Sequence, residues 1–205
     1  MRRPTTFLPA LALGVVGAIS IAAPSLAVPI TYTEQATATG SLGGVDFTDA
    51  SVLLTMNNDT TNVIGGPTLF EILGTATVSV NGGAPVTFTD SIEVFSAQAV
   101  SPASVGFADL TRSLDILDDT SASFATYAVT TSIGPISNTA FISANEAFPT
   151  TGGAFILTSV AGPTSSFTAT TVAVPAPGGL PVALAFVGVW FGAKLLERRR
   201  KRRSL

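Results

Sequence analysis

The sequence predicts an all-β fold for the central part of the chain, in the form of an antiparallel, jelly-roll-like β-sandwich. Between Ile30 and Val174 the residues are rich in Thr, Ser, Val, Phe and Gly, and β-branched and aromatic residues favour strands. Apolar and polar residues alternate repeatedly, which is the period of a strand with one buried face. Turn signals separate these stretches at a spacing that suits a sandwich.

The clearest predicted element is a hairpin. Residues 75–80 (TATVSV) alternate, Asn81-Gly82-Gly83 follows as a turn, and residues 86–89 (VTFT) resume the alternation, which is the pattern of two paired strands. The other predicted strands span residues 31–39, 51–56, 69–73, 92–97, 114–117, 124–131, 154–160 and 166–173. A short helix is an alternative for residues 138–147.

Glycine, proline and asparagine mark the predicted turns, because they supply positive φ, fixed φ or local hydrogen bonds. These turns are Asn57-Asn58-Asp59, Gly65-Gly66-Pro67, Gly134-Pro135, Gly152-Gly153 and Gly162-Pro163. The core is expected to be rich in phenylalanine, since each ring buries a large apolar area. The candidates for inward positions are Phe47, Phe70, Phe88, Phe95, Phe107, Phe124, Phe155 and Phe167.

Charge is distributed very unevenly along the chain. Between Val28 and Val174 the only basic residue is Arg112, against twelve Asp and Glu residues, which gives a formal net charge of −11. Nucleic acid is therefore an unfavourable partner, because phosphate binding relies on Lys and Arg. The acidic surface favours solubility outside the cell.

The composition also excludes most catalytic chemistry. The chain has no Cys and no His, so a disulfide framework, the usual general base and the commonest transition-metal ligand are all missing. Without Lys in the body, Ser-Lys arrangements are excluded as well. A carboxylate hydrolase is disfavoured because the body has no Trp and only Tyr32 and Tyr127 to bind a sugar. We expect no catalytic residue and no cofactor.

Two groups of aspartates leave a calcium site open as an alternative. Asp46 with Asp49 forms one group, and Asp109, Asp115, Asp118 and Asp119 form the other; carboxylates are the hard oxygen ligands that calcium takes. Neither group has the spacing of an EF-hand loop, and Asp is also common in solvated turns. The corresponding functional alternative is a calcium-assisted or glycan-binding adhesin with a plain C-terminal membrane anchor.

The N-terminus has the pattern of a secretory signal peptide over residues 1–27. Arg2 and Arg3 supply the positive start, residues 8–23 form the apolar segment expected to be helical, and Ser25-Leu26-Ala27 offers small residues for cleavage. We predict that the secretion machinery exports the chain and that cleavage falls between Ala27 and Val28.

The C-terminal residues 174–205 divide into three parts. Residues 174–179 are rich in Pro and Gly, residues 180–196 form a segment that is apolar except for Lys194, and residues 197–205 are basic. As a helix the apolar part would extend about 25 Å, slightly less than the hydrocarbon core of a membrane. The stop-transfer cluster, expected to stay cytoplasmic, comprises Arg198, Arg199, Arg200, Lys201, Arg202 and Arg203.

This C-terminal pattern resembles the PEP-CTERM sorting domain, particularly its Val-Pro-Leu-Pro-Ala variant. The resemblance rests on Val174, Pro175 and Pro177, followed by the apolar segment and the arginine-rich end. It implies an exosortase-type membrane enzyme as partner in a Gram-negative-type bacterium, transient anchoring in the inner membrane, release to the cell surface, and an association with exopolysaccharide. A plain anchor with a flexible neck is one alternative. Gly178-Gly179 is also similar to the GlyGly-CTERM tail, which a rhomboid-like protease processes.

Overall fold

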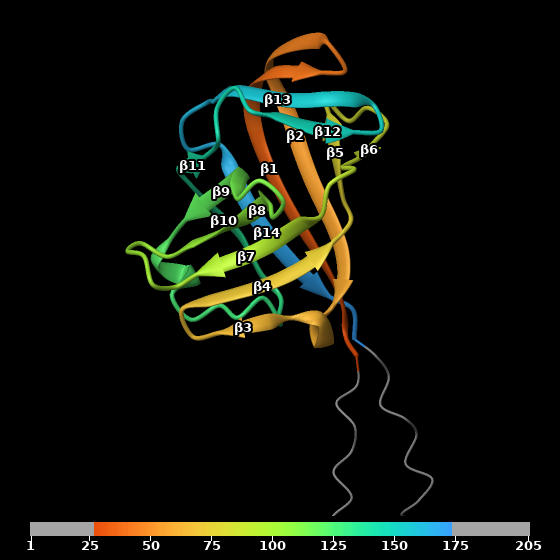
Figure 1. Ribbon diagram of the computed structural model, residues 1–205. Helices are drawn as coiled ribbons and strands as arrows, with labels where there is room; N and C mark the ends of the chain where they lie inside the picture. Colours follow the sequence, from red (N-terminus) through yellow and green to blue (C-terminus); the bar gives the residue numbers. More distant parts are fainter. Residues whose placement is uncertain (1–26, 174–205) are drawn as a thin grey trace, which may run out of the picture.

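The computed structural model describes residues 27–173, which form two antiparallel β-sheets with a common core between them (Figure 1). The all-β prediction is confirmed for this part of the chain. In residues 27–173 no helix has the length and apolar character needed to cross a membrane. The predicted signal helix and the predicted membrane helix over residues 180–196 lie outside the described residues.

The first sheet has eight strands, which are β1 (Pro29–Leu42), β2 (Val45–Asp59), β5 (Ala76–Val80), β6 (Val86–Thr87), β10 (Ile133–Asn138), β12 (Ala147–Thr150), β13 (Gly153–Val160) and β14 (Ser165–Thr171). Six of them follow one another in the order β10-β14-β1-β2-β5-β6, while β13 pairs with β1 and β12 with β13. The predicted hairpin is confirmed, because β5 pairs with β6 and the turn has positive φ at Asn81 and Gly82.

The second sheet has six strands, which are β3 (Ile64–Gly66), β4 (Leu69–Gly74), β7 (Ile92–Ala97), β8 (Ser104–Asp109), β9 (Leu114–Thr120) and β11 (Ala140–Phe141). Their order is β11-β9-β8-β7-β4-β3. Two short 3-10 helices complete the described secondary structure, η1 (Thr60–Asn62) and η2 (Ala122–Phe124).

Strand β1 is central to the first sheet. It pairs with β2 from Pro29 to Leu42, while its other edge pairs first with β14 and then with β13. A register shift next to Gly40 follows within the part of β1 that pairs with β13. A Cβ at Gly40 would lie 2.0 Å from the carbonyl oxygen of Ile156, so the close approach of β13 requires glycine here.

Phe167 in β14 is the centre of an aromatic cluster in the core. Its ring centroid lies 6.4 Å from Tyr32, 6.0 Å from Phe124 and 6.2 Å from Tyr127. Phe124 and Tyr127 belong to the loop that leads from β9 to β10. Phe167 therefore attaches this loop to the first sheet.

One predicted strand and one alternative helix are absent from the structure of these residues. Residues 124–131 are not a strand, because Ser121 caps η2 and the chain then turns, so that Phe124 and Val129 are buried from a loop. Residues 138–147 contain no helix but the end of β10, β11 and the start of β12. Strand β8 was not predicted, because its outward residues are Ser104, Gly106 and Ala108 rather than larger polar residues.

Most of the predicted phenylalanine positions lie in the core. Phe88, Phe107, Phe124, Phe155 and Phe167 are buried there, and Phe47 and Phe70 pack against it half-buried. Phe95 is an exception, because it alternates with the inward residues Val94 and Ser96 and lies outside the core cluster. Phe148 is a core residue that the sequence analysis did not include.

Substituting Phe167 with alanine should destabilise the domain by about 3–5 kcal/mol. The substitution would leave a cavity and remove the ring that three other aromatic rings contact. Phe141→Ala is the matched control, since Phe141 is 66% exposed. This substitution should lower the free energy of unfolding by less than about 0.5 kcal/mol. Urea unfolding followed by far-UV circular dichroism measures both changes. Equal losses for the two variants would contradict the role assigned to Phe167.

Candidate functional site

Carboxylates gather on the outward side of the second sheet. The strand register aligns Asp115 in β9 with Ala108 in β8, and Ala108 with Glu93 in β7. A second row runs Asp118, Gly106, Phe95, Glu71 across β9, β8, β7 and β4. We call the four acidic residues Glu71, Glu93, Asp115 and Asp118, together with the β8 residues between them, the acidic face.

Small residues in β8 leave room for carboxylates of the acidic face to pack closely against the sheet. A Cβ at Gly106 would lie 2.3 Å from the Cβ of Asp118, so glycine makes room for this aspartate. Asp118 is only 5% exposed. The Ser104 hydroxyl donates a hydrogen bond to its Oδ2, whereas Oδ1 of Asp118 and Oε2 of Glu93 are buried without a hydrogen-bond partner.

Burial and mutual repulsion weaken the acidity of these groups. Desolvation, followed by the charges of Glu71 and Asp115, raises the pKa of Glu93 to about 7. Desolvation raises the pKa of Asp118 to about 6, against the opposing effect of the Ser104 hydrogen bond. Burial also raises the pKa of Asp115. The carboxyl groups of the acidic face therefore become protonated at higher pH than exposed carboxylates do.

Two further carboxyl groups, those of Glu34 and Asp119, are buried inside the sandwich. Glu34 points inward from the middle of β1, is fully buried, and has no hydrogen-bond partner for either carboxylate oxygen. Asp119 is also buried and accepts a hydrogen bond from the Ser165 hydroxyl. Desolvation first, and then the charges of Asp119, Asp118 and Asp115, raise the pKa of Glu34 well above its usual value. Glu34 is consequently held as a neutral acid in the core.

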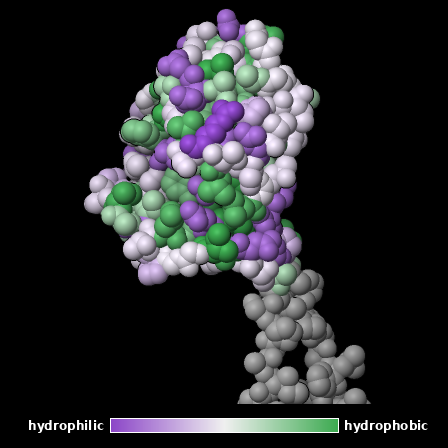
Figure 2. Space-filling model, in the orientation of Figure 1, coloured by the Kyte–Doolittle hydropathy of each residue, from purple (hydrophilic) through white to green (hydrophobic). Residues whose placement is uncertain are grey.

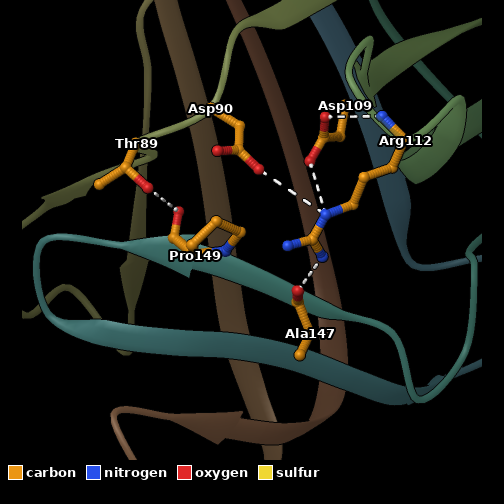
Figure 3. Close-up of polar contacts among 6 residues, drawn as sticks. All are labelled: Thr89, Asp90, Asp109, Arg112, Ala147 and Pro149. Carbon is orange, nitrogen blue, oxygen red and sulfur yellow. Dashed lines mark hydrogen bonds and ion pairs between the residues drawn. The ribbon is translucent and has the colours of Figure 1, made fainter.

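Arg112, the single basic residue of the described chain, joins three segments at the edge of the sandwich (Figure 3). Its Nε lies 3.6 Å from a carboxylate oxygen of Asp109 and 3.7 Å from one of Asp90. Its Nη1 donates a hydrogen bond to the carbonyl oxygen of Ala147 in β12. Because Asp109 is fully buried, Arg112 compensates a charge that water cannot reach.

The outward side of the first sheet has a different chemistry. One row across five strands consists entirely of threonine, in the order Thr168, Thr33, Thr55, Thr77, Thr87. The neighbouring row has Ser166, Gln35, Leu53 and Ser79. The centre of this face is uncharged, so the outward carboxylates of the strand centres belong to the second sheet.

The structure separates the two aspartate groups that the sequence suggested for calcium. Asp46 and Asp49 are exposed at the start of β2, while Asp109, Asp118 and Asp119 are buried in β8 and β9. Their interpretation as solvated turn residues is wrong for these three buried aspartates, because strand pairing extends through them. Among residues 27–173 no group of three or more acidic residues is arranged to hold a metal ion.

The signal-cleavage residues lie at the very start of the described chain. Ala27 is exposed, and Val28 is half-buried with its carbonyl oxygen accepting a hydrogen bond from the Thr60 amide at 3.0 Å. The sorting residues Val174, Pro175 and Pro177 and the stop-transfer cluster lie outside the described residues. No sequence pattern singles out Glu34, Glu71 or Glu93, because only the strand register places them beside other carboxylates.

Comparisons with known proteins identify no relative of this chain. The chain matches no model of a known protein family. Searches of curated proteins and of solved structures likewise give no significant match.

Replacing Glu34 with methionine should stabilise the domain at pH 8 by about 1–3 kcal/mol, the penalty of an unsatisfied buried polar group. A carboxyl whose pKa is raised by folding contributes its full stability below its ordinary value of 4.5 and loses it as the pH rises towards the raised pKa. The difference in the free energy of unfolding between variant and wild type should therefore be smaller at pH 5 than at pH 8. Thermal unfolding at both pH values measures it, with exposed Glu146→Met as control. An unchanged difference at the two pH values would contradict a neutral Glu34.

Replacing Arg112 with methionine should destabilise the domain by about 1–3 kcal/mol, mainly because buried Asp109 loses its compensating charge. The double variant Arg112→Met, Asp109→Asn should recover most of this loss, since the unpaired charge is removed too. Asp90→Asn is the control for the more exposed pair, with an expected cost below about 1 kcal/mol. Urea unfolding decides, and the absence of recovery in the double variant would contradict this explanation.

Proposed function

We propose that this chain is an exported, non-enzymatic surface or extracellular-matrix protein. The secretion machinery recognises residues 1–27, and an exosortase-type membrane enzyme processes residues 174–205. In this proposal the apolar segment and the basic cluster anchor the protein transiently in the inner membrane, and processing delivers it to the cell surface. Within this proposal three structural features remain predictions: a signal helix, a membrane helix and a jelly-roll-like connection of the strands.

The observation that carries the proposal is the pairing of the first and last strands at one end of the domain. Ile30 is the register partner of Thr171, and the amide of Val172 donates a hydrogen bond to the carbonyl oxygen of Pro29 at 2.9 Å. Both ends of the described chain leave the domain there (Figure 1). Strand β1 thus begins just after the predicted cleavage position, and β14 ends just before Val174, so neither processing step would cut a strand.

The charge distribution also supports this proposal. The described domain has one basic residue against twelve acidic ones, which suits a soluble protein that meets neither nucleic acid nor an anionic membrane surface. Its carboxylates lie on both faces of the second sheet and also in β1 and β2 of the first sheet, without His, Cys or Lys to complete a nucleophilic arrangement. The calcium-assisted adhesin has less support, since residues 27–173 offer no group of three acidic ligands.

Intact-mass measurement of the protein from membrane and surface fractions tests this function, with and without the processing enzyme. Surface material should begin at Val28 and lack the basic cluster. Replacing Val174, Pro175 and Pro177 together with alanine should retain the protein in the membrane with its tail intact, because these residues would carry recognition. Pro85→Ala, in an exposed loop of the domain, is the control and should be processed normally. Surface material that extends to Leu205 would refute sorting by this tail.

A further inference from the structure

We propose that Asn81 is a modification site, at which the folded domain converts asparagine into a mixture of aspartate and isoaspartate. In this reaction the backbone nitrogen of Gly82 forms a bond to Cγ of Asn81, and the bond between Cγ and Nδ2 breaks. The side-chain nitrogen leaves as ammonia and takes the proton of the Gly82 amide. Water then opens the resulting succinimide ring at either of its two carbonyl carbons. The modification does not depend on how the C-terminal tail is processed.

The residue that follows Asn81 is a glycine, and the turn requires this pair. Asn81 and Gly82 have positive φ angles of 51° and 67°, as in the type I′ turn that Asn-Gly favours. The Gly83 amide closes the turn by donating a hydrogen bond to the carbonyl oxygen of Val80 at 2.9 Å. Because Gly82 has no Cβ, no side chain hinders the approach of its nitrogen to the side chain of Asn81. The turn sequence therefore supplies both reacting groups.

The nucleophile and the leaving group are both free of competing hydrogen bonds. Asn81 and Gly82 are exposed at the end of the β5–β6 hairpin. Within residues 27–173 no acceptor receives the amide hydrogen of Gly82 or the Nδ2 hydrogens of Asn81. This hairpin lies at the edge of the domain in Figure 1, and the surface at that edge of Figure 2 is mostly pale, as small residues of intermediate hydropathy are. Ammonia can therefore leave directly into water.

The backbone of Ser51 in β2 holds the carbonyl group that is attacked. Its amide donates a hydrogen bond to Oδ1 of Asn81 at 3.0 Å, and the Asn81 amide donates one to the carbonyl oxygen of Ser51 at 2.7 Å. This reciprocal contact continues the β2–β5 pairing beyond Val52 and Val80. When a nitrogen attacks Cγ, negative charge develops on Oδ1, and a backbone N–H aimed at that oxygen stabilises it. The fold thus fixes the electrophile and leaves the nucleophile free.

The other asparagines of the chain lack this combination. None of the five is followed by glycine; they are Asn57, Asn58, Asn62, Asn138 and Asn145. The side-chain nitrogens of Asn58, Asn62 and Asn138 donate hydrogen bonds inside the domain, which hold the leaving group. Asn57 lies within β2, where pairing fixes its backbone. Asn145 has a positive φ, but the side chain of Glu146 hinders attack by the following nitrogen. These five residues are internal references for Asn81.

The two products affect the hairpin differently. Aspartate keeps an oxygen that accepts the hydrogen bond from Ser51, so the turn is retained. Isoaspartate carries the main chain through the side-chain carbon, and the extra methylene group disrupts the type I′ geometry. Only two residue pairs join β5 to β6, and Thr87 in β6 also accepts a hydrogen bond from the Thr151 amide at 2.8 Å. Isoaspartate therefore weakens the attachment of β6, and both products add a negative charge to a domain of net charge −11.

The experiment incubates the folded full-length chain in a neutral detergent at pH 8 in water enriched in heavy oxygen. Peptide mass spectrometry follows label incorporation at each asparagine and separates isoaspartate from aspartate. Asn81 should react at least about tenfold faster than each of the other five, which lack both the glycine and the Ser51 donor. Its peptide should contain isoaspartate as well as aspartate. The rate should increase with pH, because the deprotonated amide is the attacking species.

Two glycine variants test the role of the attacking nitrogen. Gly82→Ala adds a Cβ beside the nucleophile and should slow the reaction at Asn81 by about tenfold. Gly44→Ala is the matched control, because Gly44 also has a positive φ in a hairpin turn and both added Cβ atoms would lie in open space. This control should leave the rate at Asn81 unchanged. Circular dichroism verifies that both variants fold.

Four results would overturn the proposal. A rate at Asn81 no higher than at the other asparagines would remove its special reactivity. Aspartate without isoaspartate would mean direct hydrolysis by water, with no attack by Gly82. Equal slowing in the two glycine variants would assign the effect to backbone strain. Reaction of Asn81 in urea but not in the folded chain would show that the native turn protects it. Failure of tail processing changes none of these measurements, so the proposed function is tested separately.

Discussion

The fold depends on the pairing of β1, which has strand partners along both edges. Its residues Pro29–Leu42 pair with β2 on one side and with β14 and then β13 on the other, so the N-terminal strand of the domain holds its C-terminal strands. The same pairing brings both ends of the domain together, and this arrangement makes tethering through the C-terminus compatible with an intact fold.

A shortage of positive charge is the second constraint on this protein. With one arginine among residues 27–173, most carboxylates can be compensated only by hydroxyl groups, by water or by a proton. Asp118 and Asp119 use the hydroxyls of Ser104 and Ser165, Asp109 uses Arg112, and Glu34 is held neutral by burial. Burial raises the pKa of all four carboxyl groups, so each of them favours folding more at mildly acidic pH than at neutral pH.

The two outer faces of the sandwich differ in the chemistry of their side chains. The first sheet presents uncharged rows centred on Thr33 and Thr55, whereas the second presents desolvated carboxylates with exposed leucines. The carboxyl groups at the centres of the outward faces are therefore concentrated on the second sheet.

Much of the fold was determined by local sequence pattern. Alternation and the Asn81-Gly82 turn predict the β5–β6 hairpin, the long run from Thr31 predicts β1, and the phenylalanines predict most of the core. Strand β8 and the loop around Phe124 could not be predicted, because small outward residues hide the alternation of β8 and a loop can bury apolar residues as a strand does. The acidic face could not be predicted either. Glu71 and Glu93 are distant in sequence from Asp115 and Asp118, and only cross-strand register, which is decided by tertiary packing, places the four residues on one side of the sheet.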